Sequence, residues 1–364
     1  MDKHSTVIVV GAGASIPYGL PSGENLVTDI LLSVKQKIRQ DVITTVKGKN
    51  GRNVFFNFST LNPGRNRKDV ERYLEKYHDH YHELVRDENV QILFTELKLL
   101  EDLSSRTVNS IDFYLESNRD AMLSKVTKWH IANVIRRKEQ EEINLRRDGY
   151  RDKKEFCSDW LEFLFYELEL HRHPERLSQI EFINFNYDRI IERFFDLAFK
   201  THFPKGENSH GHDLLKKHLN MHHVHGSLGN YDRIDYETND KELAGISKMS
   251  ETISVMDERG SCDEAKEALV NATTIIFLGF GFDQSNFEKI WDSRMGRDAG
   301  TANPRCYMKG SGFKLGASKR KTIESLVGGH PMINIGSEEK VLGNVNETCL
   351  GLLENYPCLS SLME

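Results

Sequence analysis

The feature that most restricts the fold is a short β-branched run that stops abruptly at glycine. Residues 6–10 read Thr-Val-Ile-Val-Val and are followed by Gly11 and Gly13. The run is too short for a helix, and continuous apolar character of this kind is typical of a strand buried on both faces of a parallel sheet. The sequence therefore predicts a buried first strand with a glycine turn at its carboxyl end.

Three later runs have the same design, in which a strand leads directly into a polar or glycine-containing turn. They cover residues 181–185, 222–225 and 273–278, and a weaker fifth candidate at 332–335 follows a helix-like segment at 319–326. Ligands of parallel α/β sheets bind beyond the carboxyl ends of the strands. The residues of these turns are therefore the first candidates for a functional site.

Between residues 66 and 180 the pattern changes to apolar residues at helical spacing among many charges. It predicts helices near 68–86, 89–103, 108–140 and 154–172. The charged stretch from Arg136 to Lys154 predicts a solvated helix pair with a turn near Asp148 and Gly149, and a basic partner-binding surface is the alternative.

We therefore expect an α/β fold, with a Rossmann-like parallel sheet and a mostly helical insertion. Residues 1–65 and 181–364 would form the sheet domain, and residues 66–180 would form the helical insertion subdomain.

Composition narrows the class of protein. Hydrophobic residues make up 38% and charged residues 29% of the chain, and the apolar runs are shorter than the ~20 residues of a membrane span. The N-terminal run is interrupted by glycine and lacks the features of a secretory signal, so we expect a cytoplasmic protein. A net charge of −6 argues against a protein whose main task is to grip duplex phosphates.

The cysteines are scattered and form no C-x-x-C pair. This spacing favours buried thiols over a zinc ribbon or a redox dithiol. The five are Cys157, Cys262, Cys306, Cys349 and Cys358.

The first motif is Gly11-Ala-Gly-Ala-Ser15, with Gly19-Leu-Pro-Ser-Gly23 shortly after it. Glycines after a buried strand permit a tight turn and the close approach of a phosphate to backbone N–H groups. Ile16 occupies the third glycine position of a G-x-G-x-x-G fingerprint, and no Gly-Lys-Ser/Thr of a Walker A loop follows. A plain structural turn stays open as the alternative.

The second motif is Asn184-Phe-Asn-Tyr-Asp188, at the end of a predicted strand. Asparagine and aspartate are depleted in strands, so their presence needs a reason. Asp188 suits the capping of a helix that starts near Arg189. Because one cap does not require both residues, Asn186 is a candidate for chemistry.

The third motif is His223-Val-His-Gly-Ser227. Alternation along a strand would place His223 and His225 on one face. A histidine beside such a turn suits a general base, and a core histidine is the plain alternative. Metal binding is a further alternative, although no carboxylate or thiolate set completes a site; the neighbouring histidines are His210, His212, His218 and His222.

The fourth motif runs from Phe277 to Asn286 and again combines a strand end with a glycine-broken polar loop. Such a loop would wrap an adenosine, with Phe280 or Phe282 against a ring. Both phenylalanines suit a hydrophobic core equally well.

In this order, the motifs resemble the sirtuin-like NAD-binding family, in particular its bacterial branch without a zinc ribbon, whose members act as NADases in antiphage defence. Two further elements match that branch, Leu20-Pro-Ser-Gly23 and Ser110-Ile-Asp-Phe-Tyr-Leu115. The resemblance extends from residue 11 to about residue 286.

The resemblance implies roles for individual residues. Asn186 would contact the nicotinamide ribose and position the water, and His225 would act as general base. NAD⁺ would be the substrate, and no metal is expected. The residues expected to bind the dinucleotide are Gly11, Ala12, Gly13, Ser15, Pro21, Ser22, Asp112, Asp188, Gly226, Ser227, Gly279, Gly281 and Phe282.

One departure from the deacetylating sirtuins refines the expected reaction. Those proteins carry paired cysteines of a zinc ribbon after the histidine motif, whereas residues 228–272 contain only Cys262. The resemblance then implies hydrolysis of NAD⁺ to nicotinamide and ADP-ribose. Alternatives that stay open are an NAD-dependent protein deacylase or ADP-ribosyltransferase, and a non-catalytic NAD or nucleotide sensor.

An NADase must be controlled in its own cell. We therefore expect a homo-oligomer, gated by assembly or by a separately encoded partner such as a helicase-like ATPase. Nucleic acid would be involved only indirectly, and no membrane is expected.

Overall fold

A computed structural model describes most of the chain in separate stretches. They are residues 6–40, 43–47, 53–57, 88–105, 108, 110–147, 159–203, 210–229, 242–254, 261–291, 307–311, 316–328, 342 and 348–355. The chain divides into two compact units. The sheet unit comprises residues 1–20, 138–237 and 256–364, and the helical unit comprises residues 21–137 and 238–255.

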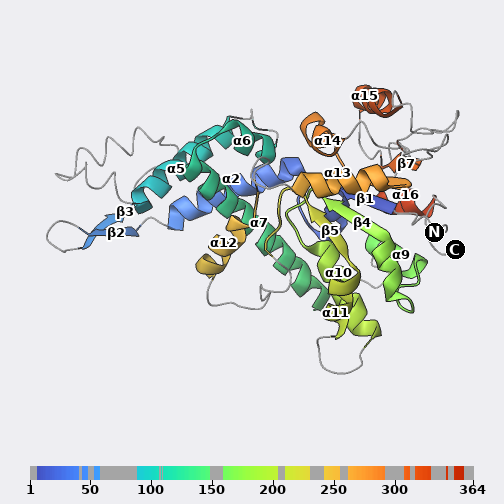
Figure 1. Ribbon diagram of the computed structural model, residues 1–364. Coiled ribbons are helices and arrows are strands. Elements are labelled where there is room, and N and C mark those ends of the chain that lie inside the picture. Colours follow the sequence, from blue (N-terminus) through green and yellow to red (C-terminus); the bar gives the residue numbers. More distant parts are fainter. Residues whose placement is uncertain are drawn as a thin grey trace. The chain divides into compact units, whose positions relative to one another are not determined.

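The sheet unit alternates strands and helices (Figure 1). Its elements in chain order are β1 (Thr6–Val10), α1 (Ala12–Ser15), a 3-10 turn (Ile16–Tyr18), α9 (Trp160–Glu167), a second 3-10 turn (Pro174–Gln179), β4 (Ile180–Asn184), α10 (Ile190–His202), α11 (His210–His218), β5 (Asn220–His223), α13 (Ser261–Asn271), β6 (Thr274–Leu278), α14 (Gln284–Ile290), β7 (Tyr307–Gly310), α15 (Ala317–Gly328) and α16 (Cys349–Glu354).

The strands form one parallel sheet in the order β5-β4-β1-β6-β7. Val10, the last residue of β1, lies opposite Asn184 of β4 and Leu278 of β6, so these three strands end at the same edge. From β1 the chain first builds the sheet toward β5 and then returns to build it toward β7. The strand order therefore reverses between β1 and β6, which is where open α/β sheets bind ligands.

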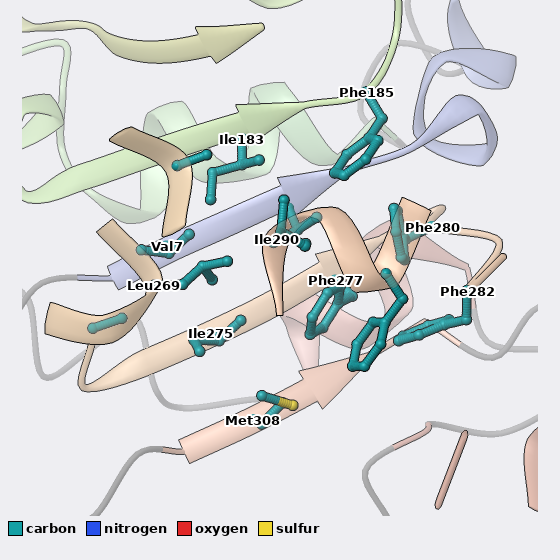
Figure 2. Packing of buried hydrophobic residues seen from close by; sticks show 14 of the residues in the cluster. Val7, Ile183, Phe185, Leu269, Ile275, Phe277, Phe280, Phe282, Ile290 and Met308 are labelled. Carbon is teal, nitrogen blue, oxygen red and sulfur yellow. The ribbon is translucent and has the colours of Figure 1, made fainter. Parts of the chain in front are cut away.

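Both faces of the sheet are covered, which explains the unbroken apolar run of β1. On one face, Val7 and Val9 pack with Ile275 and with Leu269 of α13 (Figure 2). On the other face, Phe182 of β4 packs against Phe195 of α10. Each fully buried side chain of this size contributes roughly 1.5–3 kcal/mol relative to exposure, so β1 anchors the unit from both sides.

The helical unit is built mainly from long helices and one antiparallel hairpin. Its elements are α2 (Gly23–Gln40), β2 (Ile43–Lys47), β3 (Asn53–Asn57), α5 (Glu88–Ser104), α6 (Ile111–Ser117), α7 (Ala121–Arg147) and α12 (Glu242–Glu251). The boundary between the units falls within α7, after Arg137. Among the described residues, no helix combines the length and the apolar character needed to cross a membrane.

The predicted α/β Rossmann-like architecture is confirmed, and so are the strands expected near residues 6–10, 181–185 and 273–278. The helices expected at 89–103 and 319–326 are confirmed as α5 and α15. The segments 68–86, 148–149 and 332–335 lie outside the described residues. The expected domain boundaries stay a prediction.

Other expectations were wrong in detail. The single helix expected over 108–140 is two helices, because Asn118 leaves the helical conformation and Asp120 accepts hydrogen bonds from the first N–H groups of α7. The helix expected over 154–172 ends at Glu167, and Glu169 then turns with a φ of 52°. The hairpin β2–β3 and the strand β7 were not predicted, although Gly48 and the Asn50-Gly51 pair between β2 and β3 were an available turn signal.

Candidate functional site

Two glycine turns lie in direct backbone contact at the carboxyl ends of β1 and β6. The N–H of Gly11 donates to the carbonyl of Leu278 (3.0 Å), and the N–H of Gly13 donates to the carbonyl of Gly279 (2.9 Å). A Cβ on Gly13 would lie 2.8 Å from the Cα of Gly279, and one on Gly279 would lie 2.0 Å from the nitrogen of Ala14. Gly279 also has a φ of 58°, in the left-handed region.

These glycines are therefore required for the close approach of the two turns. The sequence had suggested that they leave room for a phosphate, with a structural turn as the alternative. In this structure the N–H groups of Gly11 and Gly13 are already donors to protein carbonyls, so the structural explanation accounts for both glycines. Their contact with a dinucleotide stays a prediction, and so does that of Ala12.

Asn186 follows β4 and turns its amide toward the first glycine turn. Its Nδ2 donates to the carbonyl of Gly11 (3.1 Å) and to Oγ of Ser15 (2.9 Å). Its backbone N–H is held by Oδ1 of Asn184 (2.9 Å). Both amide hydrogens are thus used, and Oδ1 of Asn186 accepts no hydrogen bond from the described residues. This side chain presents a fixed acceptor.

Asp188 is buried two residues further along the same loop. Its Oδ1 accepts the N–H of Ile190 (3.2 Å) at the start of α10, which fits the expected turn chemistry. Burial raises the pKa of Asp188 to about 7, and the charge of Glu139 adds to this effect. Glu192 raises it further, while hydrogen bonds from Ser15 and Ile190 act in the opposite direction. Ser15 thus connects Asn186 with a carboxyl that titrates near neutral pH.

A buried ion pair holds the end of this loop. Oε2 of Glu139 lies 2.8 Å from the guanidinium of Arg189, and Oε1 accepts the backbone N–H of Arg189 (2.8 Å). Both side chains are 1% exposed. The expectation that residues 136–154 form a solvated helix pair is therefore wrong for Glu139, because the end of β4 supplies a buried partner for its charge.

His225 lies in the turn after β5 and is 2% exposed. Its Nε2 lies 3.3 Å from Oδ1 of Asn286 in α14. The rings of Phe185 and Tyr187 lie 5.6 and 6.0 Å from the imidazole centroid. These two residues flank Asn186, so one loop orients both catalytic candidates.

His223 has different partners from His225. Its Nε2 lies 2.8 Å from Oε1 of Glu192. Burial alone would lower the pKa of His223, but Glu192, the charge of Asp188 and the backbone of Asn186 together raise it above its usual value. The two histidines were expected to share a strand face. That expectation was wrong, because β5 ends at His223 and the chain turns before His225.

The turn after His225 is closed by its own backbone. Gly226 has a φ of 70°, and its N–H donates to the carbonyl of His223 (3.3 Å). Oγ of Ser227 donates to the carbonyl of Gly229 (3.1 Å). Both residues shape the loop beside His225, and their contact with a dinucleotide stays a prediction.

The loop after β6 places its phenylalanines in the core. Phe280 and Phe282 are buried against each other, with ring centroids 5.1 Å apart, and against Phe277 (Figure 2). This matches the core alternative left open by the sequence, and Phe282 tolerates a φ of 47° within that packing. A Cβ on Gly281, by contrast, would meet nothing within 4 Å. Gly281 thus has space beside it, unlike Gly11, Gly13 and Gly279.

The remaining candidates belong to the helical unit. Oγ of Ser22 accepts the N–H of Asn25 (3.3 Å) in the first turn of α2, directly after Pro21. Asp112 lies in the first turn of α6, which Ser110 caps. The assignment of Pro21, Ser22 and Asp112 to the binding of a dinucleotide stays a prediction.

The described side chains contain no group of three or more histidines, cysteines or carboxylates arranged to hold a metal ion. Cys349 is buried, as expected of a structural thiol, and burial raises its pKa to about 11. The other cysteine side chains lie outside the described ones.

Some residues that shape the site were not recognised from the sequence. Ser311, after β7, accepts the N–H of Gly279 (2.8 Å) and so holds the second glycine turn. Asn286 ends the fourth motif but was given no role, although its pattern of a polar residue near a strand end was the available signal. Glu139 gave no signal, because charge within a helix usually indicates solvent.

Comparison with known proteins adds one finding. No curated protein matches the chain. Within residues 180–324, which hold the loops of Asn186, His225 and Gly279, the sequence matches the family model of the SIR2-like domain. The glycine turn of β1 lies outside this match, yet the structure places it against Asn186 and Gly279. The match supports a sirtuin-like family for this chain.

Proposed function

We propose that the chain is an NAD⁺ glycohydrolase, which cleaves NAD⁺ to nicotinamide and ADP-ribose. A SIR2-like domain is compatible with NAD-dependent activity. The observation that carries the proposal is the hydrogen bonding of the Asn186 side-chain amide. Gly11 and Ser15 hold its two hydrogens, so Oδ1 is left to accept a hydrogen bond from a water or a ribose hydroxyl.

The chemistry needs few protein groups. Nicotinamide leaves with the electrons of the bond to ribose C1′ and becomes neutral, and the ribose passes through an oxocarbenium-like state. A water then forms the new C1′–O bond and releases a proton. Asn186 would orient the water or the ribose, and His225 would accept the proton. Orientation and exclusion of bulk water supply much of such a rate enhancement.

Hydrolysis is favoured over deacylation by the sequence between the two later motifs. Residues 228–272 contain a single cysteine, which is too few for the zinc ribbon of deacetylating sirtuins. Neither NAD⁺ hydrolysis nor deacylation requires the pyrophosphate of NAD⁺ to contact Gly11 or Gly13. Gly281 is the better candidate for a close approach, because it has free space where a Cβ would lie.

The test is to incubate the purified chain with NAD⁺ and to follow nicotinamide and ADP-ribose. We expect Asn186→Ala and His225→Ala to lower kcat by about 10²–10⁴-fold, the usual effect of losing a general base or an orienting group. Matched controls are Asn220→Ala and His202→Ala, whose side chains are exposed. Full activity in either site variant would contradict the assignment.

Other products would identify other functions. O-acetyl-ADP-ribose formed with an acetylated peptide would indicate deacylation, and binding of NAD⁺ without turnover would indicate a sensor.

The variant Gly281→Ala adds a test of NAD⁺ binding. We expect it to raise KM for NAD⁺ severalfold while the unfolding midpoint stays unchanged, because the added methyl meets no protein atom.

We further propose, from the resemblance to bacterial antiphage NADases, that the chain depletes cellular NAD⁺ during phage infection. A homo-oligomer or a separately encoded partner such as a helicase-like ATPase would control it, in the cytoplasm. Measurement of NAD⁺ in infected cells that carry the wild-type or the Asn186→Ala chain tests this role. Equal NAD⁺ in both would contradict it.

A further inference from the structure

Among the described residues, the imidazole of His225 makes one polar contact, and aromatic rings fix its position. Phe185 and Tyr187 pack on the imidazole, and Nε2 faces Oδ1 of Asn286 at 3.3 Å. Which of the two ring nitrogens carries the hydrogen decides which one can act as a base. That choice is set by the hydrogen bond that the other nitrogen makes.

Lys289 determines which atom of Asn286 faces His225. Its Nζ lies 2.7 Å from Oδ1 of Asn286, one turn earlier in α14. An ammonium has three donors and no acceptor, so the atom that faces it must be the amide oxygen and not the amide nitrogen. Lys289 is 9% exposed, which makes an unfavourable donor–donor contact expensive at this position. The orientation of the amide is therefore chemically determined.

The orientation of Asn286 in turn determines the tautomer of His225. The amide oxygen only accepts, so Nε2 must donate and therefore carries the hydrogen. A neutral imidazole has one N–H, which leaves Nδ1 with a free lone pair. Nδ1 of His225 has no hydrogen-bond partner among the described residues.

We infer that Asn286, anchored by Lys289, is a positioning residue that holds His225 as the Nε2–H tautomer and makes Nδ1 the atom that accepts the proton. The catalytic part of this inference rests on the proposed NAD⁺ hydrolysis. In the step itself, the Nδ1 lone pair forms the new N–H bond, and the electron pair of the broken O–H bond stays on the oxygen. Nε2–H donates to Asn286 both before and after this transfer, so the contact need not rearrange.

The inference predicts that removal of the amide oxygen of Asn286, but not substitution of Gln284 on the same helix α14, changes the tautomer of His225. Asn286→Leu removes the acceptor and keeps the branching at Cγ, whereas Asn286→Asp keeps an oxygen that only accepts. Gln284→Leu is the matched control, because Gln284 is exposed on the same helix and bonds only Glu288. The readout that does not depend on activity is the tautomer, measured on the full chain labelled with ¹⁵N-histidine.

Two-bond ¹H–¹⁵N spectra at about pH 8.5, where imidazole is ordinarily neutral, report which nitrogen is protonated. The signals of His225 are identified by their loss in His225→Gln. We expect the Nε2–H form in the wild type, in Asn286→Asp and in Gln284→Leu, and a mixture of tautomers in Asn286→Leu. We also expect Asn286→Leu to lower kcat for NAD⁺ hydrolysis by about 10–100-fold with little change in KM.

Each outcome is informative. An Nδ1–H tautomer in the wild type, or an unchanged tautomer in Asn286→Leu, overturns the inference. If Asn286→Leu does not fold, a loss of the Nε2–H form or of kcat in Asn286→Asp overturns it instead. If the spectra are as expected but the wild type consumes no NAD⁺, the proposed function fails while the positioning of His225 stands.

Discussion

A cluster of buried polar side chains in the helical unit bonds side chain to side chain, whereas several polar side chains at the carboxyl edge of the sheet also bond to loop backbone. In the helical unit, Oγ of Ser33 lies 2.9 Å from Nδ1 of His130 and accepts Nδ2 of Asn133 (3.1 Å). Lys37 pairs with Glu96 at 2.8 Å. Helices satisfy their own backbone groups, so a polar side chain buried between them must find another side chain.

The sheet unit follows the other rule at the carboxyl edge of its strands. Asn186 donates to the carbonyl of Gly11, Glu139 accepts the N–H of Arg189, and Ser311 accepts the N–H of Gly279. Where the chain leaves a strand for a turn, its backbone N–H and C=O groups no longer bond to a neighbouring strand. These side chains provide the missing hydrogen-bond partners. Polar groups in the helical unit therefore set how helices pack, and those at the sheet edge set the shape of the candidate site.

The largest expected effect comes from the buried ion pair at the sheet edge. Glu139→Leu leaves the guanidinium of Arg189 without its carboxylate and removes the acceptor of its backbone N–H. We expect the free energy of unfolding to fall by about 3–5 kcal/mol, measured by urea titration. Glu141→Leu is the matched control on the same helix, since Glu141 is exposed and its ion pair with Lys138 lies at the surface.

The control should change the free energy of unfolding by less than about 1 kcal/mol. Glu139→Leu should also lower kcat for NAD⁺ hydrolysis, because Arg189 directly follows Asp188 in the loop of Asn186. If Glu139→Leu lowered the free energy of unfolding no more than Glu141→Leu does, the buried ion pair would not stabilise the loop more than a surface ion pair does.

The next effect is a pH dependence carried by Asp188. Its pKa is raised from an ordinary 3.8 to about 7 in the folded chain, so the folded state binds more protons than the unfolded state between these values. Stability from this residue is therefore present at low pH and is lost as the pH rises toward 7. Between pH 5 and 8 the loss amounts to roughly 2–3 kcal/mol.

Asp188→Asn keeps a neutral group in place and should flatten this slope, measured as the urea unfolding midpoint across that pH range. His223, whose pKa is raised despite its burial, contributes a slope of the same sign. Asp263→Asn, at an exposed position of α13, is the control and should leave the slope as in the wild type. An equally steep slope in Asp188→Asn would show that another group carries it.

The smallest effect is expected in the helical unit. Ser33→Ala leaves Nδ1 of His130 and Nδ2 of Asn133 without their shared hydroxyl, which destabilises by about 1–2 kcal/mol. The exposed Ser117→Ala serves as the reference in the same unit. We expect the rate of NAD⁺ hydrolysis per folded molecule to stay unchanged in both. A loss of kcat in Ser33→Ala alone would mean that the helical cluster also shapes the catalytic loop.

Much of the sheet and its turns was predictable, because the signals are local. A β-branched run followed by glycine defines β1, and a polar residue pair after an apolar run marks the end of β4. The same reasoning failed at β5, where the predicted strand was displaced toward His225. A run of histidines carries no alternation of apolar and polar residues, so nothing local marked the end of the strand at His223.

The partners of the site residues were not predictable, because they are distant in the chain. In the sequence, Glu139 is one of many charges in a charged helix. In the structure, the loop after β4 places Arg189 beside it. Asn286 reads as a loop residue until the turn after β5 brings His225 to it. Phe282 fitted a ligand contact and a core position equally well; its burial against Phe277 matches the core position, and its contact with a dinucleotide stays a prediction.

The sequence by itself determined the strand-and-turn design, because hydrophobic periodicity and glycine act over a few neighbouring residues. It also determined which polar residues stand at the carboxyl ends of the strands. Only the tertiary structure decided what those residues do to each other. It packs two glycine turns backbone to backbone and shares Oδ1 of Asn286 between Lys289 and His225. It also leaves Oδ1 of Asn186 without a donor among the residues that the structure describes. Such contacts depend on side chains that are neighbours in space and not in sequence.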